Sequence, residues 1–418
     1  MKKLLTVTLF SGLLTLLRMV SGFVISKVVA IHAGPSGIAM LGQVQSIVAA
    51  LNGVAAAPVG NGVVRFTAEH REAGFDACAP WWRASLQWLF GMVCLLIPVT
   101  MLFSKQLATW TMADPSYAWL LVVVALTLPM AGANTLFASV INGQQLYRRF
   151  IGLGIISVVI STALTLVLIY AYGRDGALLS AAISAGVAGV IMGLGVMREP
   201  WFRLRFWWGR TDRQHLRQIG GYVAMAVCSA SCAALSVILV RNILVSSLGW
   251  EQTGHWQAVF KISEIYLGVL TVALSTYYLP RLSGLRDAGD IRKEILHTAR
   301  VVMPIVSLLA LGIYLLRDVA ISLLFTQQFA PARDLFAVQL IGDVVKMLSW
   351  LFAYPMLSRG ATGLFIFSEI LFSATFVGLS FVFVNAIGVQ GATLAFALNY
   401  LAYFIFVVLY LPKHGRQP

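Results

Sequence analysis

Apolar stretches of about the length needed to cross a lipid bilayer recur twelve times along this 418-residue chain. A membrane-spanning helix needs roughly 20 consecutive apolar residues. Hydrophobic residues make up 59% of the chain and charged residues only 11%, whereas soluble domains are about 25% charged. The sequence therefore excludes a soluble globular enzyme and predicts an all-α polytopic membrane protein. The predicted spans are residues 4–32, 37–64, 84–103, 117–142, 150–172, 176–197, 218–247, 253–280, 301–316, 331–357, 362–384 and 389–411.

Lysine and arginine are distributed unevenly between the two sets of loops. The loops and termini on one side hold 21 of these residues, and the loops on the other side hold four. Cytoplasmic loops retain such cations, so we expect both termini to be cytoplasmic. The same asymmetry explains the formal net charge of +14. We therefore expect the chain to lie in the lipid bilayer and not to bind nucleic acid.

The loop at 198–217 divides the predicted spans into two sets of six. It contains six Arg and three Trp, which is typical of a strip on the inner membrane interface. Spans one and seven both end near a glycine, Gly34 and Gly249, and an intramembrane cation precedes each of them. We therefore expect twelve transmembrane helices in two six-helix bundles around a central cavity, an arrangement typical of transporters. The predicted parts are an N-terminal bundle at 1–200, a cytoplasmic linker at 201–214 and a C-terminal bundle at 215–418.

Eight ionisable side chains lie inside the predicted spans and form the candidate substrate-binding and translocation site. Each costs roughly 2.5–3.5 kcal/mol at a helix centre, so each requires a partner, a wet cavity or a substrate. Five are cations and three are acids, and this excess favours an anionic ligand. The residues are Arg18, Lys27, Arg241, Lys261, Glu264, Asp343, Lys346 and Glu369.

Two pairs among these residues have alternative interpretations. Lys261 and Glu264, like Asp343 and Lys346, are spaced i,i+3, which places both side chains on one helix face. Each pair either neutralises its own charges as part of the architecture or lines the path of the substrate.

The three remaining intramembrane cations differ in depth. Arg18 lies about 24 Å from the outer turn at ~1.5 Å per residue, too deep to reach the outer interface. Lys27 and Arg241 lie only about 10–12 Å from it, where a long side chain reaches the interface without any functional role. Arg18 and Lys27 are nine residues apart and point in opposite directions unless the helix bends at Gly22.

We expect no catalytic residue, no cofactor and no metal site. The longest outer loops, around 104–116 and 317–330, offer only one acid each, and no phosphate-binding loop is present. Cys228 and Cys232 lie four residues apart, but a zinc site needs three or four ligands, so we interpret them as packing residues and expect no disulfide.

Several segments resemble the Wzx-type flippases of the multidrug/oligosaccharidyl-lipid/polysaccharide exporter superfamily, among them the flippases of enterobacterial common antigen and O-antigen assembly. The resemblance covers essentially the whole chain. It is most specific at residues 329–346, at Trp256-Gln257, at residues 277–283 and at Leu316-Arg317-Asp318. The family has charged residues at the positions of Arg18, Lys27, Arg241, Lys261, Glu264, Asp343 and Lys346.

This resemblance implies a function in the cell inner membrane. A Wzx-type flippase moves an undecaprenyl-pyrophosphate-linked oligosaccharide, such as a lipid III or O-antigen unit, from the cytoplasmic to the periplasmic leaflet by alternating access. It further implies a glycan polymerase and chain-length machinery as partners.

Two other functions are alternatives to a flippase. A multidrug antiporter of the same superfamily uses intramembrane carboxylates for cationic drugs, and an excess of cations has the wrong sign for that cargo. A membrane glycan polymerase or ligase would need a large outer domain, which the predicted loops do not provide.

Overall fold

The computed structural model describes residues 2–274, 278, 281–282, 285, 288–358 and 362–410. Within these ranges all regular elements are helices and there is no strand. Nine helices in the described part of the chain are long and apolar enough to cross a membrane. The predicted fold class, an all-α polytopic membrane protein, is therefore confirmed.

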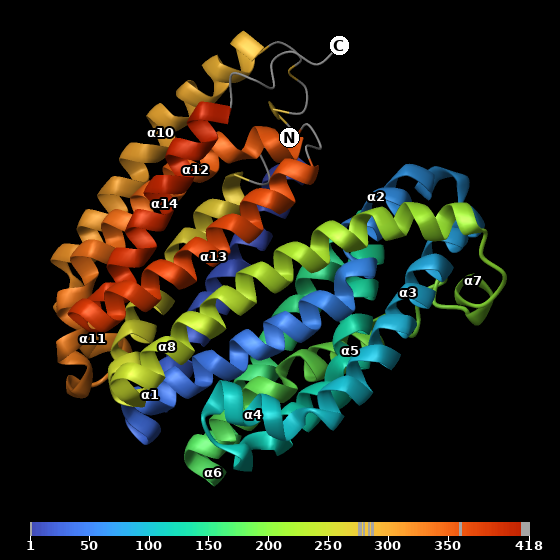
Figure 1. Cartoon of the computed structure of the whole chain (residues 1–418). Helices are drawn as coiled ribbons and strands as arrows, with labels where there is room; N and C mark the ends of the chain where they lie inside the picture. Colours follow the sequence, from blue (N-terminus) through green and yellow to red (C-terminus); the bar gives the residue numbers. More distant parts are fainter. Residues whose placement is uncertain are drawn as a thin grey trace. The chain divides into compact units, whose positions relative to one another are not determined.

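Long helices joined by short turns make up the chain (Figure 1). The first half contains α1 (Lys2–Ala56), α2 (Asn61–His70), α3 (Phe75–Leu102), α4 (Ser104–Met112), α5 (Ala118–Gly143), α6 (Tyr147–Val196) and the short α7 (Leu204–Trp207). The second half contains α8 (Arg213–Ala273), α10 (Ala288–Leu315), α11 (Arg317–Leu324), α12 (Phe336–Ser358), α13 (Thr362–Ile387) and α14 (Gln390–Tyr410). Single 3₁₀ turns lie at Ala57–Val59, Arg71–Ala73 and Pro115–Tyr117, and a longer 3₁₀ segment lies at Gln327–Leu335.

Three of the long helices are each two helices joined at a glycine. The joints are Gly34 in α1, Gly173 in α6 and Gly249 in α8, with φ values of 60°, 58° and 81°. Glycine adopts such positive φ angles without the steric penalty of a side chain. The joints separate predicted spans one and two, five and six, and seven and eight; the total of twelve spans stays a prediction.

The contacts within the chain divide it into two compact units. The first comprises Met1–His32 and Met40–Leu235, and the second comprises Ala33–Ala39 and the chain from Ser236 onward. The boundary falls inside α8, so the segment predicted as a linker, 201–214, packs with the first unit. The division into two six-helix bundles stays a prediction.

The segment around α7 is fixed to the first unit by aromatic packing. The rings of Trp82 and Trp207 stack at 5.3 Å, and Trp207 Nε1 donates a hydrogen bond to the carbonyl of Trp201. Trp82 Nε1 in turn donates to Thr67 Oγ1 at 2.8 Å. The tryptophans that suggested an interfacial strip therefore belong partly to a packed core.

Two segments predicted as outer loops are partly helical. Residues 104–116 contain α4, and residues 317–330 contain α11. Neither helix contains Gly or Pro, so nothing in the sequence breaks them, and a search for apolar length alone overlooks such short helices.

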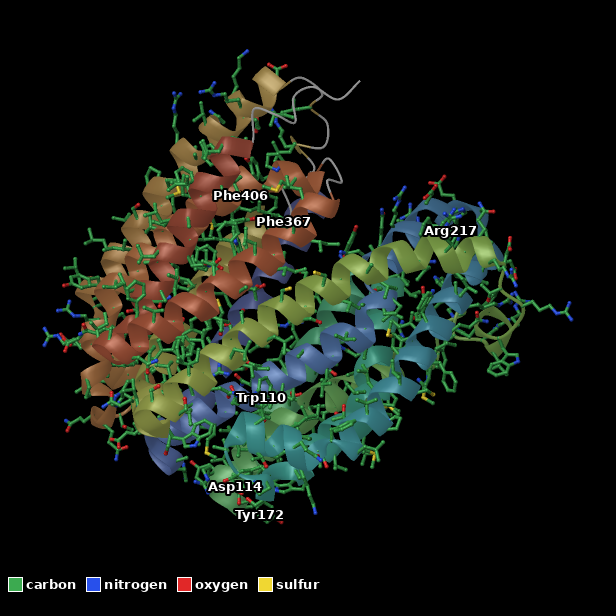
Figure 2. The ribbon with its side chains drawn as sticks, in the orientation of Figure 1. Trp110, Asp114, Tyr172, Arg217, Phe367 and Phe406 are labelled. Carbon is green, nitrogen blue, oxygen red and sulfur yellow. The ribbon has the colours of Figure 1, made fainter. Side chains whose placement is uncertain are left out.

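The two ends of the first unit carry different residues. Figure 2 shows Trp110, Asp114 and Tyr172 at one end and Arg217 at the other. The Asp114 carboxylate accepts a hydrogen bond from the Ser116 backbone N–H at 2.8 Å, and this bond lowers the pKa of Asp114. Asp114 and Arg217, which were assigned to loops on opposite sides, thus lie at opposite ends of this unit.

Candidate functional site

Arg241 is the most deeply buried of the predicted site residues with a positive charge. It precedes the joint of α8 at Gly249, and Gln257 follows that joint. The Nε and Nη2 atoms of Arg241 donate to Gln257 Oε1 at 3.1 and 2.8 Å. Only 1% of Arg241 is exposed. The neutral Gln257 amide thus orients the guanidinium and accepts two of its hydrogen bonds.

Asp343 on α12 is fully buried and accepts hydrogen bonds from three side chains. Ser263 Oγ donates at 2.6 Å and Tyr266 OH at 2.8 Å, both from α8. Gln339 Nε2, one turn earlier on α12, donates at 3.2 Å. These donors offset part of the cost of burying a carboxylate. Two of them also hold α12 against the part of α8 that follows Gly249.

Lys346 lies in an aromatic cage on the same helix. Its Nζ is 5.0 Å from the ring centre of Trp350 on α12, and 5.5 and 5.2 Å from the rings of Phe396 and Tyr400 on α14. Ring faces attract a cation by about 0.5–2 kcal/mol each, depending on desolvation. The cage therefore stabilises the ammonium group while leaving its formal charge in place.

Asp343 and Lys346 do not form the close ion pair that their spacing allows. Both residues are described, and no ion pair within 4.0 Å joins them. They attract each other at longer range. Each has its own partners, so mutual neutralisation is not what accommodates them in the interior.

A row of rings connects Arg241 with Lys346. The Arg241 guanidinium lies 6.0 Å from the ring centre of Trp256, and Trp256 stacks on Phe260 at 4.9 Å. Phe260 meets Phe396 edge-to-face at 6.3 Å, and Phe396 contacts Lys346. We call Trp256, Phe260 and Phe396 the aromatic row. It places two cations of the second unit at the two ends of one row of buried rings.

The other acidic and basic candidates of the second unit are less enclosed. Glu264 is exposed, and it interacts electrostatically with both Arg241 and Lys346. Lys261, one turn earlier on α8, is half-buried. Glu369 on α13 is also half-buried and interacts electrostatically with Tyr403. The structure therefore groups Arg241, Glu264 and Lys346, with Asp343 next to Lys346.

Arg18 and Lys27 belong to the first unit. Among the described residues of α1, only Gly34 departs from helical geometry, so α1 does not bend at Gly22. Arg18 is exposed, whereas Lys27 is half-buried. The two side chains thus lie on different faces of one helix, as their spacing predicts for an unbent helix.

The sequence found the charged members of this group and missed most of their partners. Gln257 and Gln339 stand out as polar residues within apolar spans, but Ser263, Tyr266 and the cage rings do not. Trp350 follows Lys346 by one turn, and Phe396 and Tyr400 are spaced i,i+4; both patterns are also common in ordinary cores. In the described part of the chain, no group of three His, Cys, Asp or Glu is arranged to hold a metal ion.

Comparisons with known proteins give a family and a fold. Residues 82–334 match the model of a family described as polysaccharide biosynthesis protein. The chain is 26% identical over 400 residues to proteins named lipid III flippase from Escherichia coli (strain K12) and Shigella flexneri, covering 95% of each chain.

Among solved structures, an inward-facing multidrug resistance transporter of the MATE family and MOP superfamily resembles the chain with a TM-score of 0.79. The match covers 95% of this chain and 94% of the other. At 14% sequence identity, that likeness shows the fold alone.

Proposed function

This chain belongs to the polysaccharide biosynthesis protein family, and from that premise we propose that it is a flippase for lipid-linked oligosaccharides. Its cargo is an undecaprenyl-pyrophosphate-linked oligosaccharide, a lipid III or O-antigen unit, which it moves from the cytoplasmic to the periplasmic leaflet. The matched relatives named lipid III flippase support this cargo class. The protein is a transporter and not an enzyme.

The observation that carries the proposal is the pair of cations at the ends of the aromatic row. Arg241 is oriented by an amide and Lys346 lies among aromatic rings, and both cations lie within apolar spans. Such charges are expensive in a membrane and indicate an ion or substrate pathway. A pyrophosphate carries the negative charge that two such cations attract.

The chemistry of the cargo explains the need for such residues. A pyrophosphate cannot cross hydrocarbon without compensation for its lost hydration, and each sugar hydroxyl loses hydrogen bonds to water. We assign Arg241 and Lys346 to the pyrophosphate. Arg18, Lys27 and Lys261 are further cations of the translocation path, and Glu264, Asp343 and Glu369 adjust its charge. The prenyl tail stays in lipid during alternating access.

The location and partners follow from this function. We place the protein in the cell inner membrane with both termini in the cytoplasm, because 21 loop cations fall on that side against four. A glycan polymerase and chain-length machinery would use the product on the periplasmic side.

Vesicles reconstituted with the purified chain test the function. They are loaded with a fluorescent prenyl-pyrophosphate oligosaccharide, and a glycosidase that cannot cross the membrane is added outside. We expect the cleaved fraction to rise above that of protein-free vesicles. No rise, together with exchange of a cationic drug against protons or sodium, would identify a multidrug antiporter instead.

A further inference from the structure

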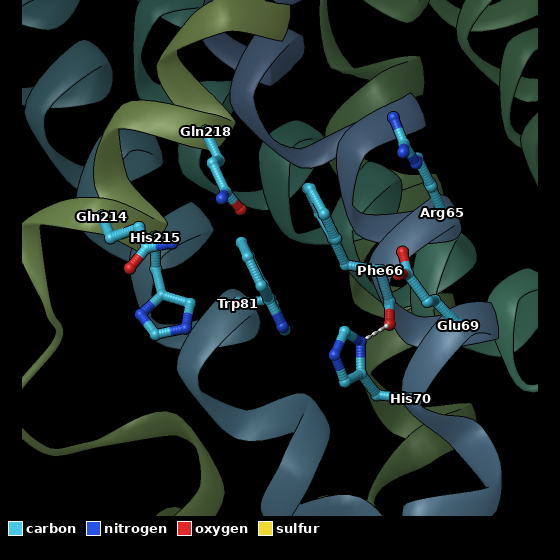
Figure 3. A pocket seen from close by; sticks show the side chains of 8 residues that line it. All are labelled: Arg65, Phe66, Glu69, His70, Trp81, Gln214, His215 and Gln218. Atoms are coloured by element: carbon cyan, nitrogen blue, oxygen red, sulfur yellow. Dashed lines mark hydrogen bonds between the residues drawn. The ribbon is translucent and has the colours of Figure 1, made fainter.

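A polar pocket opens in the first unit, away from the charged residues discussed above. It lies between α2, α3 and the beginning of α8 (Figure 3) and has a volume of about 480 Å³. Ligand pockets commonly measure roughly 300–1,000 Å³. We call it the α2–α8 pocket. Its lining residues are Arg65, Phe66, Glu69, His70, Trp81, Gln214, His215 and Gln218.

The base of the pocket is a rigid stack of rings. Trp81 stacks on Phe66 with centres 3.9 Å apart and planes 6° apart, and His215 meets Trp81 edge-to-face at 4.4 Å. Nearby, Trp88 Nε1 donates to the Leu216 carbonyl at 3.0 Å and fastens α8 to α3. The pocket therefore has its shape before any ligand arrives, which reduces the cost of binding.

The walls carry hydrogen-bonding groups on both sides. Gln214 and Gln218 are spaced i,i+4 on α8 and share a helix face, and each amide offers both donors and an acceptor. Opposite them, His70 Nδ1 donates to the Phe66 carbonyl at 2.9 Å, so the neutral ring keeps Nε2 as an acceptor. Glu69 adds a carboxylate on the same side (Figure 3).

The charges of the lining residues favour a neutral, hydroxyl-rich ligand. Arg65 and Glu69, one turn apart on α2, carry opposite formal charges. A phosphate site would instead concentrate cations and exclude a carboxylate. Planar amides and a carboxylate can each bridge neighbouring hydroxyls, which is the arrangement that a sugar ring presents.

We propose that the α2–α8 pocket binds the saccharide part of the cargo before translocation, a proposal that rests on the proposed flippase function. The pocket includes the beginning of α8, at the Arg217 end of the first unit (Figure 2). That end is the one we assign to the cytoplasm, where the lipid-linked oligosaccharide is assembled. The pocket would thus select the head group by its sugars, separately from the cations that accept the pyrophosphate.

Binding of free sugars to the purified full-length protein tests this site without any transport step. The probes are neutral di- and trisaccharides that carry neither lipid nor pyrophosphate, observed by saturation-transfer NMR and titration calorimetry. We expect saturable binding to the parent protein. The double variant Gln214→Leu/Gln218→Leu should bind at least tenfold more weakly, and Glu69→Leu should also weaken binding.

Matched controls separate the pocket from general effects of the substitutions. Gln106→Leu, at an exposed position on α4, and Glu72→Leu, at an exposed position just after α2, should bind the sugars like the parent. No saturable binding by the parent, equal binding by the double variant, or displacement of the sugar by inorganic phosphate would each overturn the pocket proposal.

The two proposals fail in different experiments. If free sugars bind in the pocket as expected but no lipid-linked oligosaccharide is moved in vesicles, the flippase function is wrong and the saccharide site stands. If vesicles show transport while the double variant binds sugars like the parent, the flippase function stands and the saccharide site is wrong.

Discussion

Asp343 and Lys346 show how two residues one turn apart acquire different environments. Three donors hold the carboxylate, and three rings surround the ammonium group. In a close ion pair, the two buried charges would have neutralised each other. The two residues instead have separate partners, and all of these partners belong to the second unit.

Removing the charges at these two positions distinguishes a structural role from a role in transport. Lys346→Met should lower translocation at least tenfold at normal abundance in the membrane, because the cage then holds no cation. Lys346→Arg should keep part of the activity, since a guanidinium also binds to ring faces. The double variant Asp343→Asn/Lys346→Met should be as inactive as Lys346→Met alone in the vesicle assay.

A structural ion pair predicts a different outcome for the same variants. Each single change would strand a buried charge, and the double change would restore function. Recovery of parental transport by the double variant would therefore show that both residues have only a structural role. Arg18, Lys27 and Arg241 would then remain as candidates for binding the pyrophosphate.

Arg18 allows a second test, because it is exposed on the first arm of α1. Arg18→Gln should leave insertion and abundance unchanged and abolish translocation, and Arg18→Lys should retain part of it because the charge matters more than the fork of donors. Arg174→Gln, at an exposed position beside Asp175, is the control. Full transport by Arg18→Gln would show that Arg18 has no role in the path.

At the scale of the helices, close packing of α12 and α14 forms the cage. A side chain at Gly342 would place its Cβ 2.7 Å from Phe396 Cδ1 and 3.2 Å from the Cα of Ala397. Only a glycine lets α14 approach α12 so closely, and this approach brings Phe396 over Lys346. The cage therefore depends on a residue that does not itself touch the cation.

Gly342→Ala should displace α14 and lower the stability of the folded protein. Overpacking of this kind typically costs about 1–3 kcal/mol, so the midpoint of thermal unfolding in detergent should fall, and transport should fall with it. Gly378→Ala on α13 is the matched control, because an added Cβ there meets no atom within 4 Å. Equal midpoints for the two variants would contradict this description of the packing.

The sequence predicts the helices better than it predicts the contacts of the site. Hydrophobic length reveals the spans, and the turn glycines Gly34 and Gly249 are recognisable because a chain reversal demands unusual backbone angles. Two of the three rings around Lys346, those of Phe396 and Tyr400, come from α14, some 50 residues later in the chain. Periodicity cannot tell a ring that packs on a cation from a ring that packs in a core, so the cage is visible only once the helices are assembled.

For the molecule as a whole, the uneven distribution of Lys and Arg predicts the orientation in the membrane. In a background without the four native cysteines, a probe at Arg205→Cys should be protected from a membrane-impermeant thiol reagent added outside intact cells. A probe at Gln252→Cys, which follows the joint of α8, should react. Both positions are exposed, so burial does not account for a difference, and the reverse pattern would invert the orientation.

The central claim is that positive charge in the interior selects a pyrophosphate-linked cargo. The most direct measurement compares two lipids with the same prenyl chain and the same oligosaccharide in the vesicle assay, one joined through pyrophosphate and the other through an uncharged linkage. We expect rapid translocation of the pyrophosphate form, at least tenfold faster than the neutral form, and loss of this preference in Lys346→Met. Equal rates for the two lipids in the parent protein would contradict it.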